Sequence, residues 1–428
     1  MNAPRGRARR FAGLMPAALL LFAAVPLRAW NSPTHRIITL AVVQGFPVFK
    51  TPAGGAVSEV PAETLAQLLA SWQKQGVRGW QGSGSVGAFI QNLRLNPKGD
   101  WAAPASFKPY AGDAGSPFPL AVKPGTPVPI DSIFAAYVRE PDWGMDQDIC
   151  GRLPYPCKPD WKWMDAYAEG LPSQAFRHMY WPKGYLKLAK AIPIPIFVRH
   201  PIGQAPERCR IYFQLSVLAA DTGHLYWAAR FLAWSMHYAQ DAAQPFHTMQ
   251  IPSRKLMVFS PWPIPNQTET ARKIGYYHLA FEDYMDGYAA RLEGSIAQAP
   301  SLGQGGAQAV TAAAANFGAA HAETAADASM SFFPPITKKE LKDSTPSEEI
   351  YQRNKARSGL PPSPPAALET IAKECMAEAG GATRNLLDLF ESQARVPASA
   401  VAAAASPWSK IRAAFSLSRF GLSFDGGR

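Results

Sequence analysis

Two histidine–carboxylate pairs with four-residue spacing are the residues of this 428-residue chain best suited to chemistry. His237 precedes Asp241 and His278 precedes Glu282, each in a stretch whose apolar periodicity predicts a helix. Because residues four apart lie on the same helix face, each pair can direct both side chains at one cation. A single pair of this kind is more often a surface ion pair than a metal site. The residues around the pair therefore indicate which of the two it is.

The surroundings of His237 and Asp241 favour a metal ion. Residues 231–247 are mostly apolar and include no lysine or arginine that could neutralise the aspartate. A buried histidine and a buried carboxylate need a polar partner, and a metal ion provides one. Pro245 ends the helix and allows His247 to turn back towards the same pocket.

These residues resemble a known family. The resemblance is carried by the run His237-x3-Asp241-x3-Pro245-x-His247 and by the stretch 276–286 after it. Both are similar to the zinc-dependent phospholipase C family, whose wider superfamily includes the single-strand nucleases of the S1/P1 type. The resemblance implies an all-α, multi-helix bundle around a trinuclear zinc site.

An N-terminal and a central segment extend this resemblance. In that family the mature chain begins with a tryptophan whose amino nitrogen and carbonyl oxygen bind zinc, and here Trp30 would be first and His35 the next ligand. The family's aspartate and histidine of another zinc correspond to Asp142 and His178, with Asp146 as the alternative to Asp142. We prefer Asp142 because an acid before an aromatic residue, with a second aspartate soon after, resembles the phospholipase C pattern.

The resemblance therefore implies three Zn²⁺ ions per chain, with one aspartate shared between two of them. The first zinc would be held by Asp142, His178, His237 and Asp241, the second by His247, His278 and Glu282, and the third by Trp30, His35 and the shared Asp241.

The implied activity is phosphodiester hydrolysis by a metal-activated water, which Asp142 would orient or deprotonate. Glu282 favours a phospholipase C that cleaves glycerophospholipids to diacylglycerol and a phosphorylated head group, because nuclease relatives usually have aspartate there. The spacing of five residues between Trp30 and His35 is as short as in the nucleases. An S1/P1-type enzyme acting on single-stranded nucleic acid is therefore an alternative. A non-catalytic, zinc-stabilised surface-binding protein is a third hypothesis.

Aromatic residues near the ligands are candidates for substrate binding. Trp143 directly follows Asp142 and would stand beside the metals. Residues 256–265, between two ligands, are unusually apolar for a connection. Phe259 and Trp262 in this segment either dip into the headgroup region of a phospholipid membrane or belong to a lid packed on the protein's own core.

Residues 1–29 predict an export signal, because a basic segment precedes an apolar stretch of 15 residues, 11–25, and a small residue precedes Trp30. We expect an extracytoplasmic, monomeric mature protein. These 29 residues contain five arginines and no acid, so the remainder keeps +6 of the formal charge of +11. That excess suits a phospholipid surface or a nucleic acid without choosing between them.

Four cysteines are compatible with an oxidising compartment. Cys150 and Cys157 could close a local disulfide, which would leave Cys209 and Cys375 as a long-range pair. Three pairings are possible, and the spacing does not decide among them.

The elements that must position all these residues are predicted to be helices. Strand alternation is scarce, and the periodic stretches are residues 34–45, 62–75, 211–220, 225–243, 271–292, 307–329 and 365–394. We expect one all-α catalytic domain over residues 30–397, with a Pro/Gly-rich loop insertion at about 76–130 and an Ala/Ser/Arg-rich tail at 398–428.

Overall fold

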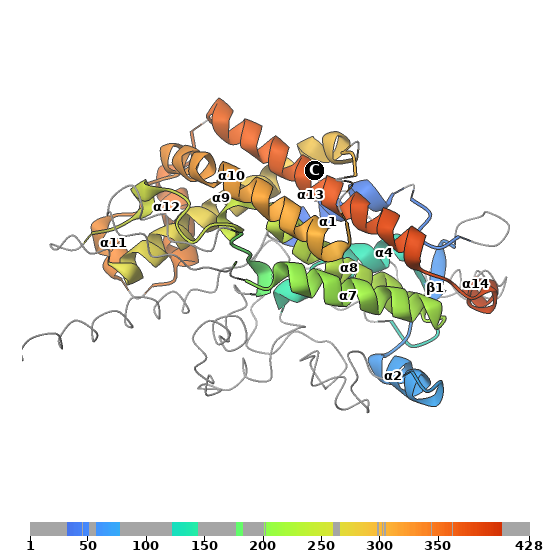
Figure 1. Cartoon of the computed structure of the whole chain (residues 1–428). Helices are drawn as coiled ribbons and strands as arrows, with labels where there is room; N and C mark the ends of the chain where they lie inside the picture. Colours follow the sequence, from blue (N-terminus) through green and yellow to red (C-terminus); the bar gives the residue numbers. More distant parts are fainter. Residues whose placement is uncertain are drawn as a thin grey trace, which may run out of the picture.

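The computed structural model confirms the all-α class. It describes residues 32–50 without 45, 57–77, 122–143, 177–182, 201–259 without 202, 266–301 without 298, 303, 305–361 without 344, and 363–404. Within these ranges the secondary structure is helical apart from one two-stranded sheet (Figure 1).

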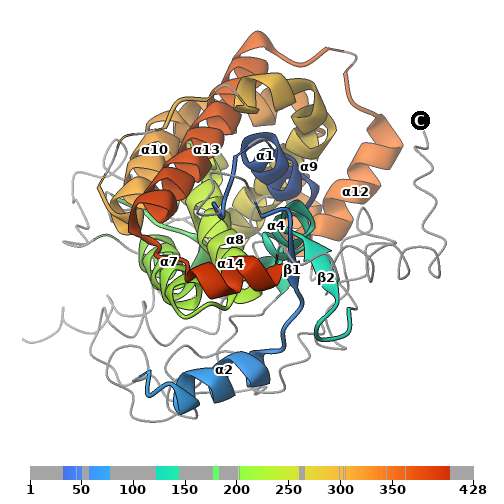
Figure 2. The same cartoon turned by 90° about the vertical axis from the view of Figure 1, so that its right-hand side faces the viewer.

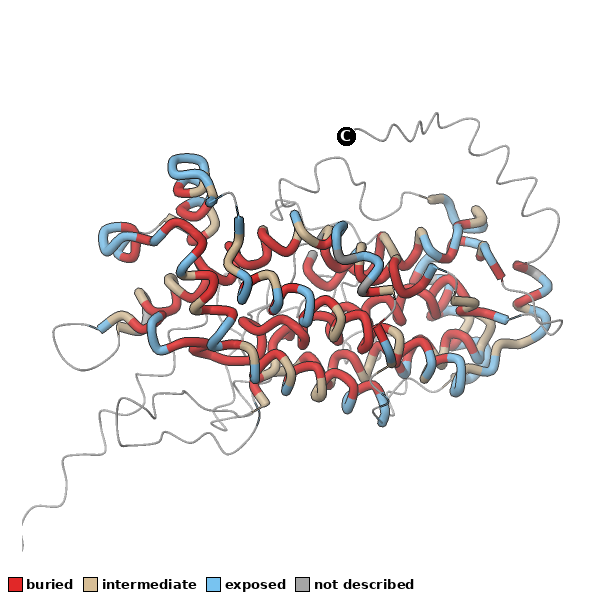
Figure 3. Tube along the Cα trace, turned by 90° about the horizontal axis from the view of Figure 1, so that it is seen from above, coloured by how far each residue is buried: buried red, intermediate tan, exposed pale blue. Residues whose placement is uncertain are grey.

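Helix α8 (Leu225–Ala242) is the centre of the bundle. All its residues are buried, as expected of a helix that is apolar on every side. It packs against α7 (Ala205–Asp221), α10 (Ala307–Phe332) and α13 (Ala366–Gln393), which surround it in Figures 1 and 2. The buried turns of these helices face one another across a shared interior (Figure 3).

Three further helices, α1 (Ser32–Val43), α9 (Gln267–Ala297) and α4 (Ile130–Tyr137), close the bundle around α8. The N-terminal helix α1 packs against α9, α13 and α4. Helix α4 in turn packs against α8. Segments more than 200 residues apart in the chain therefore meet on α8, and the histidines on α1, α8 and α9 can meet there too.

The tight turn between α7 and α8 depends on a glycine. Gly223 has φ +85°, a left-handed conformation that residues with a Cβ adopt at a cost. The N–H of His224 donates to the carbonyl of Ala219 at 2.8 Å and ends α7. This turn sets the start of α8 and hence the depth at which its candidate ligands His237 and Asp241 lie.

Each of the seven predicted helices is present, with ends shifted by a few residues. Six of them are the helices α1, α7, α8, α9, α10 and α13 described above. The seventh, predicted over 62–75, is α2 (Leu65–Lys74), which begins with a capping box between Thr64 and Gln67. The sequence did not predict α4, α11 (Lys338–Lys342), α12 (Ser347–Ser358) or α14 (Ala398–Ala404). Helix α12 buries only one narrow stripe, at positions 347, 350, 351 and 354, which is too little apolar signal to read as a helix.

The predicted end of the loop insertion, at about residue 130, is wrong. Val128 is 3 % exposed and lies in β2 (Pro127–Pro129), which pairs antiparallel with β1 (Glu59–Pro61). Ile130 is also buried, and α4 begins there. These residues belong to the core rather than to a surface loop; the prolines that flank Val128 hid the strand. Residues 78–121 of the insertion lie outside the described residues.

One of the possible disulfides, between Cys209 and Cys375, is not formed in the structure. Cys209 and Cys375 are both buried free thiols. The Cys209 sulfur lies 3.2 Å from the Ser235 hydroxyl and contacts the carbonyl of Ala307. The two cysteines thus serve as small core residues, a common use of unpaired cysteine.

Several predicted features lie outside the described residues: the export signal 1–29, Trp30, Asp146, Cys150, Cys157, Trp262 and most of the tail beyond α14. Within the part that is described, no helix is both long enough and apolar enough to cross a membrane.

Candidate metal centre

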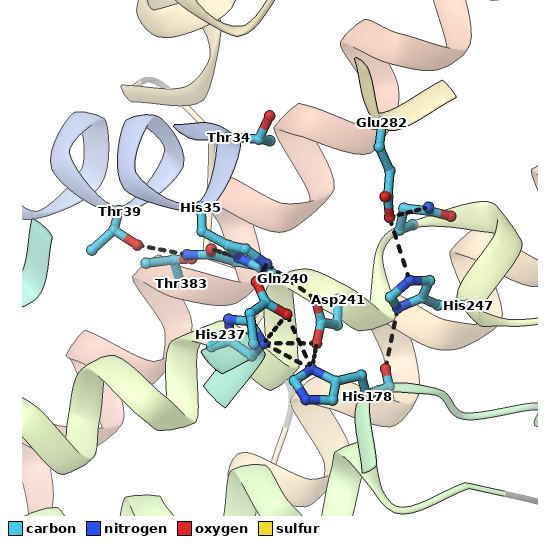
Figure 4. Close-up of polar contacts among 12 residues, drawn as sticks. Thr34, His35, Thr39, His178, His237, Gln240, Asp241, His247, Glu282 and Thr383 are labelled. Carbon is cyan, nitrogen blue, oxygen red and sulfur yellow. Dashed lines mark hydrogen bonds and ion pairs between the residues drawn. The ribbon is translucent and has the colours of Figure 1, made fainter. Parts of the chain in front are cut away.

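Helix α8 supplies the two central side chains of the site. His237 and Asp241 are fully buried, and the Nε2 atom of His237 lies 3.2 Å from Oδ2 of Asp241 (Figure 4). The four-residue spacing therefore places both on one helix face, as predicted from the sequence.

Two residues from separate segments complete this first group. His178 Nδ1 lies 2.8 Å from Asp241 Oδ2 and 2.9 Å from His237 Nε2. Asp142 lies in the short 3₁₀ helix η5 (Pro141–Trp143) that follows α4, and its Oδ1 is 3.5 Å from His237 Nε2. The structure thus brings Asp142, the preferred aspartate, to the histidines.

The second group consists of His247, His278 and Glu282. Nε2 of His247 and Nε2 of His278 lie only 3.0 Å apart, and Oε1 of Glu282 is 2.7 Å from the latter. His247 follows α8 in the 3₁₀ helix η7 (Pro245–His247), and the other two stand four residues apart on α9. This is the grouping that the resemblance implied.

The third group begins with His35 on α1. Its Nε2 lies 3.2 Å from Oδ1 of Asp241 and 3.9 Å from Oδ2 of Asp142. Oδ1 of Asp241 therefore faces His35, while Oδ2 of the same carboxylate faces His178 and His237. The aspartate lies between two groups, as the resemblance implied. Asp142 lies between the same two groups, which sequence reasoning missed.

The segment around His178 is held in place by backbone contacts on both sides. The N–H of Tyr180 donates to the carbonyl of His247 at 3.1 Å. The N–H of Ala205, at the start of α7, donates to the carbonyl of Met179. A Cβ on Gly203 would lie 2.0 Å from the Met179 oxygen, so only glycine allows this approach. His178 is thereby fixed between η7 and α7.

Helix α10 holds the His247 turn in a similar way. A Cβ on Gly318 of α10 would lie 2.9 Å from the Thr248 side chain and 3.1 Å from the carbonyl of Ala242. The glycine therefore lets α10 approach the end of α8 closely, which positions the turn that carries His247.

Burial keeps two imidazoles of this centre, those of His35 and His278, available as ligands. Burial, together with the neighbouring His237, lowers the pKa of His35 to about 4, and burial lowers the pKa of His278 to about 3. Both rings are therefore neutral at neutral pH, with a lone pair for a cation.

The carboxylates feel opposite effects. Burial alone would raise the pKa of Asp241, but the charge of His237 and the hydrogen bond from His178 hold it well below its usual range. Burial raises the pKa of Glu282 to about 8. Its Oε2 is buried and has no hydrogen-bond partner in the described part of the chain. A buried carboxyl group of this kind is stabilised either by a proton or by a bound cation.

The donors fit a transition-metal ion. Three sets of ligand atoms, each within 4.8 Å of one another, can be drawn from eight buried residues: His35, Asp142, His178, His237, Asp241, His247, His278 and Glu282. Imidazole nitrogens with carboxylate oxygens are typical of zinc and its neighbours in the first transition row. The described residues therefore form a possible multi-metal site.

The candidate substrate residues are not brought together with the ligands in what the structure describes. The backbone of Trp143 follows Asp142 in η5, and its side chain is outside the described part. Phe259 is 44 % exposed.

Two buried networks next to the ligands were missed by sequence reasoning. Gln240 contacts His35, and Glu140, which pairs with Arg230, lies two residues before Asp142 along the chain. Gln240 and Arg230 are polar residues in a mostly apolar helix, and this was the sequence signal that could have indicated the two networks. Comparisons with models of known protein families and with curated proteins found no match, so functional inference rests on this site.

Proposed function

We propose that the protein is a zinc-dependent phosphodiester hydrolase of the phospholipase C type, which cleaves glycerophospholipids to diacylglycerol and a phosphorylated head group. The observation that carries the proposal is the position of Asp241 between two groups of buried ligands, His35 on one side and His178 with His237 on the other. A shared carboxylate favours closely spaced cations, the arrangement used for phosphodiester displacement.

The side chains would act as follows in this proposal. Bound metal ions would neutralise the phosphate oxygens and lower the pKa of an attacking water. His237, Asp241 and their partners would hold those ions. Asp142, which lies between two groups, would orient the water and accept its proton. Burial strengthens every one of these electrostatic contacts because the surrounding dielectric is low.

A lipid substrate is favoured by one exposed side chain. Phe259 is the one large hydrophobic residue that is strongly exposed in the described part of the chain. It lies between His247 and α9, which carry ligands of the second group, so it stands on a connection anchored at the metal centre. Arg254 precedes it in η8 (Arg254–Leu256) and is exposed, which suits an anionic surface. Lys255 beside it is also exposed but forms an ion pair with Asp327.

The deciding experiment is a parallel assay of the mature protein, residues 30–428, in the presence of zinc. We expect release of the phosphorylated head group from phosphatidylcholine vesicles, and no release by His237→Ala purified in the same way. Cleavage of single-stranded DNA without lipid hydrolysis would replace the proposal by a nuclease. Metal binding without either activity would indicate a zinc-stabilised binding protein.

Activity is expected to depend on cleavage before Trp30. In the proposed site the free amine and the carbonyl of Trp30 would complete the group begun by His35, whereas a peptide nitrogen must first lose its proton. A form that keeps the residues before Trp30 should bind one metal equivalent less and lose most of its turnover. Metal analysis and head-group release measure both.

A variant with one extra glycine before Trp30 is the control, since it moves the amine while leaving the rest of the chain unchanged. Full metal content and turnover in this variant would show that the N-terminus is not a ligand.

Phe259→Ala combined with Trp262→Ala is expected to weaken vesicle binding and hydrolysis of lipid aggregates by roughly 10-fold or more, since burying two aromatic side chains is worth a few kcal/mol. Turnover of a short-chain, monomeric phosphodiester should remain nearly unchanged, because neither residue is a ligand. Vesicle cosedimentation and two-substrate kinetics measure this.

Equal losses on both substrates would mean that the connection supports the fold of the site. A selective loss of single-stranded DNA cleavage would mean that the aromatics stack on bases, and would favour the nuclease.

A further inference from the structure

Gln240 is a buried amide next to Asp241, and its carboxamide reaches two other helices. Its Oε1 lies 2.7 Å from Nδ1 of His35 on α1, and its Nε2 lies 2.8 Å from the hydroxyl of Thr39, one turn further along α1. Nε2 also lies 3.0 Å from the hydroxyl of Thr383 on α13. Figure 4 shows these side chains converging from α1, α8 and α13.

The orientation of this amide follows from its hydrogen-bond partners. The Thr383 hydroxyl has one proton, which it donates to the carbonyl of Ala379 at 2.8 Å. At Gln240 the same oxygen can only accept, so the amide atom that faces it is the NH₂ group. The two hydrogens of that group go to Thr383 and Thr39. The atom that faces His35 is therefore the carbonyl oxygen.

The amide orientation fixes the proton on His35. Because the Gln240 carbonyl can only accept, Nδ1 of His35 carries a proton and donates it. In the neutral ring Nε2 then has the lone pair, and Nε2 is the atom that lies 3.2 Å from Asp241 Oδ1. Two acceptors face each other at that distance, an arrangement that a cation between them relieves.

We propose that Gln240 is a positioning residue of the third metal group, which presents Nε2 of His35 to the cation by holding the proton on Nδ1. The proposal rests on the metal centre proposed above and adds the residue that selects the His35 tautomer. Thr383 and Thr39 act one step further out, since they hold the amide in the required orientation.

The test compares metal binding by two substitutions of Gln240 in the mature protein. Gln240→Leu removes the acceptor, and we expect the affinity for one of the three zinc equivalents to fall by about 10–100-fold, the usual effect of losing a ligand's outer hydrogen bond. Gln240→Glu keeps an acceptor for Nδ1 and should retain all three equivalents. Competition with a chelator, followed by metal analysis, measures both.

Ser235→Ala is the matched control. Ser235 is a buried side chain of the same helix, and its hydroxyl donates to the carbonyl of Cys209 on α7 at 2.9 Å. This variant also loses a buried interhelical hydrogen bond, but we expect it to keep three equivalents.

The results separate the inference from the proposed function. The role of Gln240 alone would be overturned if Gln240→Leu still bound three zinc equivalents tightly. It would also be overturned if Gln240→Glu lost as much zinc affinity as Gln240→Leu. A wild-type protein that binds no zinc would overturn the proposed function itself, and this inference with it.

A second measurement needs no substitution of Gln240. Nitrogen chemical shifts of ¹⁵N-histidine-labelled wild-type protein, with His35 assigned by its loss in His35→Gln, should show a protonated Nδ1. A protonated Nε2 with a bare Nδ1 would refute the tautomer and the proposal.

Discussion

In the proposed metal centre, Asp241→Asn is expected to cost the protein of residues 30–428 more bound metal than His247→Ala. Oδ1 of Asp241 lies 3.2 Å from His35 and Oδ2 lies 2.8 Å from His178, so its charge serves two groups of ligands. His247 belongs to one group only. Asparagine keeps the shape of the side chain but removes the charge that two cations would share. We expect a loss of two equivalents for Asp241→Asn and of one for His247→Ala.

The turnover of both variants should fall by more than the roughly 10–100-fold that accompanies loss of an outer hydrogen bond to a ligand. Metal analysis after dialysis, with head-group release on the same samples, measures the ranking. Glu63→Gln is the matched control, because Glu63 accepts from His224 Nδ1 at 2.7 Å in a histidine–carboxylate pair outside the metal centre. The reverse ranking of the two ligand variants would show that Asp241 is not the shared ligand.

Helices that carry two ligands four residues apart could be predicted from the sequence. His237 with Asp241, and His278 with Glu282, need only the periodicity of one helix to share a face. The apolar surroundings of α8 predicted its burial for the same local reason. Long, strongly periodic segments of this kind are the features that local sequence patterns report best.

Contacts between distant segments could not be predicted in that way. Gln240 is 205 residues from His35 and 143 residues from Thr383, so no local pattern pairs them. Asp142 was identified through a family resemblance, and its approach to His237 depends on α4, whose eight residues follow a proline-rich segment. The free Cys209 and Cys375 show the same limit, since an even number of cysteines does not define which thiols lie close together.

Arg230→Met is expected to lower the free energy of unfolding by about 3–5 kcal/mol, the range for breaking a buried ion pair from one side. Nε of Arg230 donates to Oε2 of Glu140 at 2.8 Å, and its guanidinium lies 3.9 Å from the ring centre of Tyr137. Trp234 Nε1 donates to the same carboxylate oxygen at 2.6 Å. Burial lowers the pKa of Arg230, but Glu140 together with Tyr137 and Tyr226 outweighs it, so Arg230 stays charged. Burial raises the pKa of Glu140 to about 7, while the charge and the hydrogen bond of Arg230 act to lower it. Methionine would leave the Glu140 charge buried without its counter-ion.

Arg210→Met provides the matched control on the neighbouring helix. Arg210 donates to Glu207 at 2.8 Å in a pair that is partly open to solvent, and its loss should cost less than about 1 kcal/mol. Denaturant unfolding of the two variants compares the pairs directly. Similar losses would mean that Glu140 is neutral in the folded protein, or that water reaches it.

The double variant Arg230→Met with Glu140→Leu separates stability from positioning. Replacing both charges removes the buried unpaired carboxylate, so much of the lost stability should return. Glu140 lies two residues before Asp142, and its bonds to Arg230 and Trp234 tie the turn that carries this ligand to α8. The double variant has lost those bonds and should still bind metal more weakly than the wild type. Recovery of both stability and metal affinity would show that packing of α4 on α8 alone is enough to hold Asp142 at the metal centre.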